Sequence, residues 1–364
     1  MDNPGKSPPD PSLIDKLPAA LRTDLRIGWV IGHGRSTASS RLQGYLVHEW
    51  LLSKGYDSRL IAENFNQEKT VWNASFFRTA LRLCRSRCDV VVFEGGDWPM
   101  MQLARLGRRW GKRAVGVRCD PIPGPYDDSY DLTIVPTADL QEALHVRRGV
   151  VIEDAVEVDP DRFKRDYTGG PRLRVGWVGH PSYGDYISAL VARLRARPEI
   201  GEHVDFELIS KGAFATRQWS EATVVDDILS CDVALIAIPQ GPWFQGKSAN
   251  RLALMMSLGM PTVATMIPSY APLAHQGENG LFVTSDDEIA AMLVRMRDAA
   301  LREKLGRNAR RTVAGKFDFD AVGPKWLAAL QSAMRAAPAS VPRNPGWHFI
   351  SVLVRLASTL TTRP

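Results

Sequence analysis

The sequence predicts an α/β protein with two Rossmann-like domains that face each other across a cleft. Short apolar runs rich in β-branched residues alternate with segments of helical periodicity, which is typical of a parallel, doubly wound sheet. The run RLRVGWVGH, from Arg172, repeats the run LRIGWVIGH, from Leu25, so two such series follow each other. The chain of 364 residues also exceeds what one hydrophobic core usually serves.

The first series is predicted over residues 25–155. Its opening strand leads into the glycine loop GHGRSTASSR and then a helix over 39–52, which Gly55 terminates. The remaining elements are the strand runs SRLIAE, DVVVFEGGD and RAVGVRCD, which alternate with helices expected over 72–85 and 99–110.

The second series is predicted over 172–336, after the break at Gly169, Gly170 and Pro171. It combines the strand runs DFELIS, DVALIAIP, TVATMIP and GLFVTS with helices over 185–195 and 248–258, and is mostly helical thereafter. We expect 1–24 to be a flexible leader, 156–171 a linker, and 337–364 a tail with a short amphipathic helix.

Composition limits the class of protein. No apolar run approaches the roughly 18 to 20 residues that span a bilayer, and the first residues lack the apolar stretch of a secretion signal, so a cytoplasmic protein is predicted. The net charge of +6 indicates anionic partners. Cys84 and Cys88 share a helix face, but no second ligand pair at metal spacing follows, so core packing is the favoured interpretation.

Three segments resemble GT-B glycosyltransferases. VVIEDAVEVDPDRF, from Val150, is similar to their interdomain segment, and KSANRLALMMSLGMPTVATMIPSY is similar to their donor-site helix, strand and loop. GENGLFV resembles the strand that follows. The resemblance covers about 25–334, is closest to retaining bacterial transferases that build surface polysaccharides, and implies transfer of a sugar from a nucleotide-sugar donor to a glycan or lipid-linked acceptor.

Four positions depart from the family pattern. Its two donor-site glutamates correspond to Gly246 and Leu254, and its arginine and lysine on the donor diphosphate correspond to His180 and Asp185. A non-catalytic scaffold that binds nucleotide or glycan is therefore an alternative, and a nucleotide-sugar epimerase of the same architecture is another. Nucleic-acid binding is not expected, because no recognisable reading module surrounds the basic residues.

The donor site is predicted at the start of the second domain's helix. Ser248 would cap that helix and direct its backbone N–H groups at a diphosphate, which Lys247, Asn250 and Arg251 would also bind. His180 is expected to donate to the phosphate or the sugar, and Tyr270 to line the same cleft. The competing interpretation is that the two cations are solvated charges at a helix start.

The acceptor site and the general base are predicted in the first domain. Gly32 and Gly34 form a loop facing the cleft, and Glu94 ends a neighbouring strand, so these three residues are expected on the acceptor side. Candidates for an inverting reaction's general base are Asp97, then Asp120, with His33 as a further acceptor-side catalytic candidate. A retaining transferase needs no such base, because the leaving phosphate can accept the proton.

No cofactor or metal is expected. Thr37 replaces the last glycine of a GxGxxG fingerprint, so a nicotinamide or flavin role has weak support. The paired acidic residues Asp127 and Asp128 lie in a loop rather than at a strand end, so metal independence is predicted.

An anionic membrane surface is a candidate partner. The arginines of 78–87 accompany Phe76 and Phe77 on one predicted helix, and a second basic run follows at 105–113. Such a face would bring a lipid-linked acceptor to the first domain at the inner face of the membrane. The segment 347–360 is a second candidate for the same surface. The alternative is a solvated helix whose apolar stripe faces the core.

Overall fold

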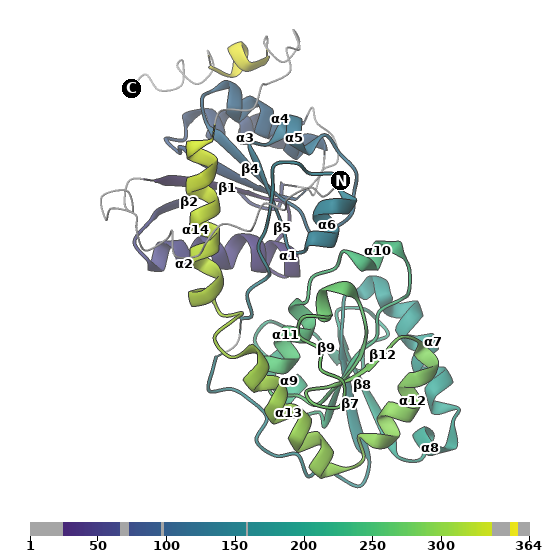
Figure 1. Cartoon of the computed structure of the whole chain (residues 1–364). Helices are drawn as coiled ribbons and strands as arrows, with labels where there is room; N and C mark the ends of the chain where they lie inside the picture. Colours follow the sequence, from purple (N-terminus) through teal and green to yellow (C-terminus); the bar gives the residue numbers. More distant parts are fainter. Residues whose placement is uncertain (1–24, 66–72, 96–97, 158, 337–349, 356–364) are drawn as a thin grey trace, which may run out of the picture.

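The chain folds into two α/β domains, each built on a six-stranded parallel sheet (Figure 1). This computed structural model describes residues 25–65, 73–95, 98–157, 159–336 and 350–355. The predicted fold class is therefore confirmed. The leader and most of the tail lie outside the described residues.

The N-terminal sheet has the strand order β2-β1-β3-β4-β5-β6. Both faces are buried: Ile27, Trp29 and Ile31 of the first strand contact one core, while Val30 contacts the other. This alternation explains why the strand reads as a continuous apolar run. The strands are β1 (Arg26–Ile31), β2 (Asp57–Ala62), β3 (Val90–Glu94), β4 (Arg113–Val117), β5 (Leu132–Val135) and β6 (Gly149–Val151).

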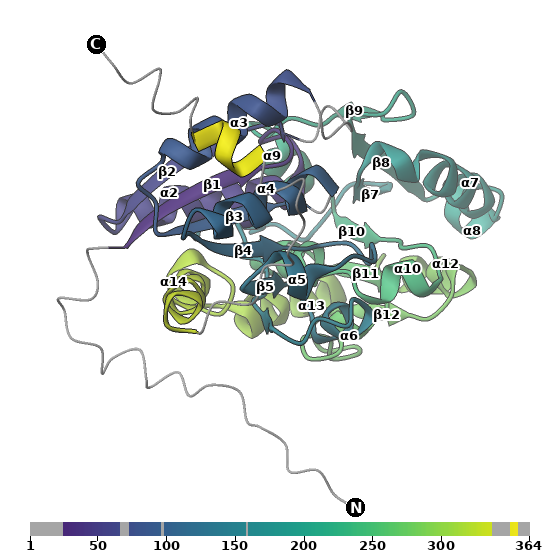
Figure 2. The same cartoon turned by 90° about the horizontal axis from the view of Figure 1, so that it is seen from above.

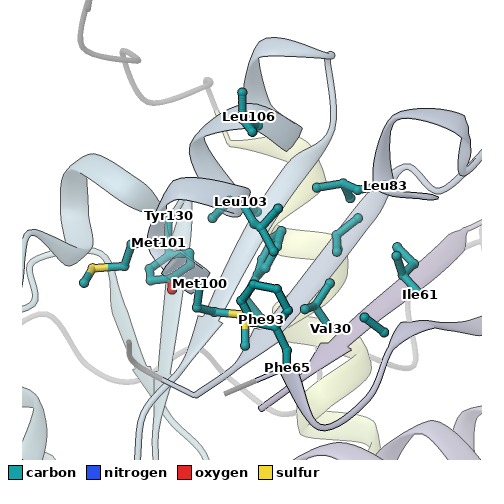
Figure 3. Packing of buried hydrophobic residues seen from close by; sticks show 14 of the residues in the cluster. Val30, Ile61, Phe65, Leu83, Phe93, Met100, Met101, Leu103, Leu106 and Tyr130 are labelled. Atoms are coloured by element: carbon teal, nitrogen blue, oxygen red, sulfur yellow. The ribbon is translucent and has the colours of Figure 1, made fainter. Parts of the chain in front are cut away.

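Helices cover both faces of this sheet. Leu83 of α3 and Leu103 of α4 pack on one face in the cluster shown in Figure 3, and α2 packs on the other. The helical elements are α1 (Ala38–Ser40), η3 (Arg41–Tyr45), α2 (Leu46–Ser53), α3 (Ala74–Arg85), α4 (Trp98–Arg109), α5 (Tyr126–Ser129) and α6 (Ala138–Ala143).

The helix predicted over 39–52 contains a π-helical turn, η3, in its first half. All five residues of this turn are buried, and Gly44 packs so closely on β1 that an added Cβ would lie 3.1 Å from Ile31 Cδ1. Apolar periodicity did not predict the turn, because periodicity does not distinguish α from π hydrogen bonding. Such turns are frequent at functional sites.

The C-terminal sheet has the order β12-β11-β10-β7-β8-β9. Its first strand in sequence, β7, buries Leu173, Val175 and Trp177 against α7. The strands are β7 (Leu173–Val178), β8 (Val204–Ser210), β9 (Arg217–Gln218), β10 (Val233–Ile236), β11 (Thr262–Thr265) and β12 (Leu281–Val283).

The helices of the C-terminal domain alternate with these strands. α11 begins two residues later than predicted and buries Leu252, Met255 and Met256. The helical elements are η5 (Pro181–Tyr183), α7 (Gly184–Arg195), α8 (Pro198–Gly201), α9 (Val224–Leu229), α10 (Pro242–Gln245), α11 (Asn250–Ser257), η6 (Pro268–Tyr270), α12 (Asp286–Arg295) and α13 (Ala299–Val313).

The last long helix, α14 (Phe319–Arg335), returns to the N-terminal domain. Val322, Trp326 and Leu330 are buried with β1 and β3 in one core, on the face that α2 also covers. Gly323 permits this contact, since a Cβ there would lie 2.3 Å from the Trp50 ring. Assigning the whole of 172–336 to the second domain is therefore wrong for this helix.

A short helix at 350–355 packs on the opposite face of the N-terminal domain. Ser351 Oγ accepts a hydrogen bond from Trp110 Nε1 at 2.8 Å, and Val354 joins the core beneath α3 and α4. Figure 2 shows this helix beside α3. Within the residues the structure describes, no helix is long and apolar enough to cross a membrane.

Candidate functional site

The loops that follow β4, β7 and β10 bring polar residues of both domains together. In a parallel sheet the carboxyl ends of the strands share one edge, and ligands of open α/β folds bind outside that edge. Asp120 follows β4, His180 follows β7, and Lys247 follows β10 and α10. The contacts described below show that the two edges face each other.

Three basic side chains gather at the start of α11. Burial and the positive charges of Arg251 and Lys247 lower the pKa of His180 below its usual value of 6.5, so the three groups lie within electrostatic reach. Arg251 is on the first turn of α11 and has no hydrogen-bond or ion-pair partner among the described residues. His180 Nδ1 accepts from Ser182 N at 3.2 Å and so caps η5, which leaves Nε2 as the nitrogen to contact a ligand.

Lys247 forms an ion pair across the domains with Asp120. Both side chains are partly exposed, at 27% and 33% of their surface. The ammonium nitrogen also lies 5.8 Å from the centre of the Trp243 ring. Lys247, which was predicted to bind phosphate, and Asp120, which was predicted as a general base, are therefore paired with each other.

Ser248 links α11 to the N-terminal domain through Asp154. Its hydroxyl donates to Asp154 Oδ2 at 2.6 Å, and Gln43 Nε2 of the π-helical turn donates to Oδ1 at 2.6 Å. Ser248 was predicted to cap α11, but the N-cap position is held by Ala249. Ser248 Oγ still accepts a hydrogen bond from Asn250 N, the first residue of the helix, at 3.3 Å. Asp154 is only 8% exposed, and burial raises the pKa of its carboxyl.

The N-terminal domain closely approaches Gly246, which the sequence resemblance aligned with a glutamate. The carbonyl of Gly246 accepts a hydrogen bond from Thr137 Oγ1 at 3.0 Å. The same hydroxyl accepts from Leu140 N at 3.1 Å and so caps α6. A Cβ at Gly246 would lie 3.3 Å from Leu140 Cβ and Cδ1, so a glutamate side chain would have to displace this contact.

The glycine loop makes a second set of interdomain contacts. Arg35 Nε donates to Glu221 at 2.9 Å and also pairs with Glu49. Arg41 Nε donates to Glu157 at 2.7 Å, and its guanidinium carbon lies 5.4 Å from the centre of the Trp219 ring. Sequence patterns gave no reason to select Arg41 or Trp219, because their partners are distant in sequence.

The acceptor-side candidates divide into exposed and buried groups. His33 is exposed, and the Gly32–Gly34 loop lies directly beyond β1. Glu94 is only 2% exposed and accepts from Gly32 N at 3.2 Å and Ser40 Oγ at 2.7 Å, while burial raises the pKa of its carboxyl. Glu94 therefore holds the loop in place.

Two other candidates are placed differently from expectation or cannot be placed. Tyr270 is 1% exposed and belongs to the hydrophobic core beneath α11, where burial raises its pKa to about 12. It supports the helix rather than lining a ligand surface. Asp97 lies outside the described residues.

Missed residues of the site have only weak sequence signals. Asp154 lies three residues after the end of β6, so its place near a strand end could be predicted from the sequence. Gln43 and Thr137 are ordinary polar residues in helical segments, and only the fold brings them to the second domain. No group of three or more potential metal-ligating side chains occurs within the described part of the chain.

The comparisons with known proteins give the fold. No family model and no curated protein sequence matches this chain. Among solved structures, sucrose-phosphate synthase of Thermosynechococcus elongatus is 12% identical with a TM-score of 0.65, over 86% of this chain and 100% of that one. A Rickettsia africae glycosyltransferase has the same identity and TM-score over 86% and 99%. Anabaena HepE, in complex with UDP and glucose, is 13% identical with a TM-score of 0.62, over 85% and 100%. The chain has the GT-B glycosyltransferase fold.

Proposed function

We propose that this protein is a glycosyltransferase that moves a sugar from a nucleotide-sugar donor to a glycan or lipid-linked acceptor. The observation that carries the proposal is the group formed by His180, Lys247 and Arg251 at the start of α11, opposite the strand ends of the N-terminal domain. HepE, which shares the fold, was solved in complex with UDP-glucose. The donor class proposed here is accordingly a nucleoside diphosphate sugar.

The chemistry of the donor explains why cations are needed. When the bond between the anomeric carbon and the phosphate oxygen breaks, negative charge develops on the diphosphate. The guanidinium of Arg251 would make paired hydrogen bonds to the phosphate oxygens, and the backbone N–H groups of the first turn of α11 would add their partial positive charge. Lys247 would add a third source of charge. A bound metal ion is not required by this arrangement.

Asp120 is the candidate general base of this proposal among the described residues. Its partner Lys247 is a phosphate ligand in the proposal, so donor binding would draw the ammonium away from the carboxylate. A free carboxylate could then take the proton of the acceptor hydroxyl in an inverting reaction. In a retaining reaction the diphosphate would take that proton, and Asp120 would only position Lys247.

Binding and turnover test the proposal together. Titration calorimetry with UDP, GDP and other nucleoside diphosphates should find one that binds, with at least about tenfold weaker binding by Arg251→Ala. The matched control is Arg297→Ala, which removes an exposed arginine between α12 and α13. Transfer from the corresponding nucleotide sugar should need an acceptor.

The outcomes separate the competing functions. Unchanged affinity in both Lys247→Ala and Arg251→Ala contradicts the donor site. Conversion of the nucleotide sugar into its epimer in the absence of an acceptor indicates an epimerase. Binding without hydrolysis or transfer across a donor panel indicates a non-catalytic scaffold.

We also propose that the face formed by α3, α4 and the 350–355 helix contacts an anionic membrane. Trp98 and Leu353 are 50% and 48% exposed there, and Phe77 is exposed on α3. Arg105 lies with its guanidinium carbon 5.6 Å from the centre of the Trp98 ring. Apolar side chains that alternate with basic ones are typical of interfacial membrane binding.

Part of the basic run predicted for this surface faces inward instead. Arg108 forms a buried ion pair with Asp131, and Lys112 donates to the backbone oxygens of Ser86 and Cys88. These two cations stabilise the fold and do not belong to the membrane face. Arg78 and Arg82 are exposed on α3.

Sedimentation with vesicles tests the membrane contact. The protein should bind vesicles that contain phosphatidylglycerol and release them at high salt, and Trp98→Ser with Leu353→Ser should weaken binding severalfold. Val294→Ser, on an exposed position of α12, is the control. Equal binding to neutral vesicles, or equal loss in the control, contradicts the proposal.

A further inference from the structure

A basic cavity lies on the C-terminal domain, away from the interdomain residues. Its volume is about 490 Å³, which is within the range of small-molecule sites. It lies between the segment that joins the domains and the second half of α13. Its side chains include Phe163, Arg165, Tyr167, Arg307, Arg310 and Arg311.

The cavity carries an excess of positive charge. Arg307 pairs with Glu303 at 2.7 Å, but within the part of the chain that the structure describes no carboxylate lies within ion-pair distance of Arg165, Arg310 or Arg311. Arg310 donates one hydrogen bond to Pro160 O at 2.6 Å, which leaves most of its five donors available.

Two of the guanidinium groups are oriented by an aromatic ring. The guanidinium carbons of Arg310 and Arg165 lie 3.8 and 4.8 Å from the centre of the Phe163 ring. A guanidinium that stacks through its face keeps its N–H donors in its own plane, where they can bind an oxyanion in pairs. The contact with an uncharged ring holds two cations beside each other and does not neutralise them.

The cavity lies at the opposite end of α11 from the proposed donor site. Tyr167 Oη donates to Gly259 O at 3.0 Å, and Lys164 N donates to Leu258 O at 2.8 Å, so the segment is fixed where α11 ends. Arg251 is on the first turn of the same helix. Because α11 has eight residues and a helix rises about 1.5 Å per residue, the two sites are about 12 Å or more apart.

We infer that this cavity is a second anion site, which binds a phosphate or diphosphate group. The ligand is an inorganic phosphate species or a phosphorylated sugar, since both present the same oxygens to the arginines. Because Phe163 and Arg165 belong to the segment between the domains, a bound anion ties that segment to α13.

Calorimetry with inorganic pyrophosphate on the full chain tests the site. The variant Lys247→Ala with Arg251→Ala removes the cations of the proposed donor site and should retain pyrophosphate binding. Made in that background, Arg165→Gln with Arg311→Gln should weaken pyrophosphate binding at least about tenfold. Arg295→Gln with Arg297→Gln removes the same charge from exposed positions outside the cavity and should bind as the parent does. The melting temperature of each variant establishes that it is folded.

The outcomes are unambiguous. Binding lost only in the cavity variant supports the site, and tighter binding of a sugar 1-phosphate than of inorganic phosphate then identifies a phosphorylated glycan as its ligand. Binding that is absent in the parent, unchanged in the cavity variant or equally weakened in the control variant overturns the inference. Binding already lost in the Lys247 and Arg251 variant also overturns it, and supports the donor site.

Discussion

Asp120 and Lys247 form an ion pair that joins the loop after β4 to the segment before α11, and so connects the two domains. The ammonium group of Lys247, which we propose binds a donor phosphate, is therefore already paired with a carboxylate. A donor diphosphate must compete with Asp120 for the same ammonium group, which gives the pair opposite expected responses to substitution.

Asp120→Asn should strengthen nucleoside diphosphate binding, and Lys247→Ala should weaken it. Partly exposed pairs are worth about 0.2 to 1 kcal/mol, so the increase in affinity should reach at most about fivefold. If Asp120 is also the general base, the turnover number of the Asp120→Asn variant should fall while its nucleotide affinity rises. Calorimetry and steady-state kinetics measure the two effects, and an Asp120→Asn variant that binds nucleotide more weakly contradicts the competition.

Nucleotide affinity should rise as the pH falls through the pKa range of His180, from its value with diphosphate bound to its lower value in the free protein. Burial, Arg251 and Lys247 lower the pKa of His180 in the free protein. A diphosphate beside the imidazole would raise that pKa again, so binding would take up a proton, and linkage then makes binding stronger at lower pH. His180→Gln should remove this part of the dependence. A pH profile of the dissociation constant that is identical in the variant contradicts contact between His180 and the phosphate.

Introducing at Gly246 the glutamate that the sequence resemblance implies should not raise transfer activity. An added Cβ would lie 3.3 Å from Leu140, and the longer side chain would force α6 and the α11 segment apart. Overpacking of this kind costs typically about 1 to 3 kcal/mol. We expect Gly246→Glu to lower the melting temperature and the nucleotide affinity, with a smaller effect for Gly246→Ala. A more active Gly246→Glu variant of unchanged stability would show that the contact opens freely.

Two glycine-to-alanine substitutions within helices should change stability in opposite directions. At Gly306 of α13 the new Cβ would lie 2.3 Å from Gly259 O, and a backbone oxygen cannot rotate away, so a loss of at least about 1 to 3 kcal/mol is expected. At Gly107 of α4 the nearest atom would be Leu83 Cδ2 at 3.4 Å, an ordinary contact, and alanine's helix propensity should add up to about 1 kcal/mol. Urea unfolding of both variants measures the contrast.

The sequence predicted the elements better than their partners. The apolar runs predicted β1 and β7 correctly, because both faces of each strand are buried. Gly55 correctly predicted the end of the first long helix, since its φ of 83° is a conformation that glycine adopts readily. The sequence also predicted an anion-binding position at the start of α11. That Lys247 would meet Asp120, a residue 127 positions away, depends on the packing of two domains and has no local signature.

The same limit applies to α14. The spacing of Val322, Trp326 and Leu330 gives one apolar helix face, which either sheet could have covered. Only the fold shows that the N-terminal sheet receives it, beside Trp50 and Trp29. Similarly, a buried arginine such as Arg108 looks like a surface charge in the sequence, because its partner Asp131 comes from a later turn.

The return of α14 makes the N-terminal domain discontinuous, since it consists of 25–155 together with 319–335 and 350–355. As the chain leaves the ribosome, part of one face of the first sheet, beside α2, must stay uncovered until the whole second domain has been synthesised. The second domain, whose core is contiguous in sequence, can form in the meantime. A substitution that slows the folding of the second domain would therefore delay burial of Trp29 in the first. Such a substitution would lower the yield of folded protein more than it lowers the equilibrium free energy of unfolding.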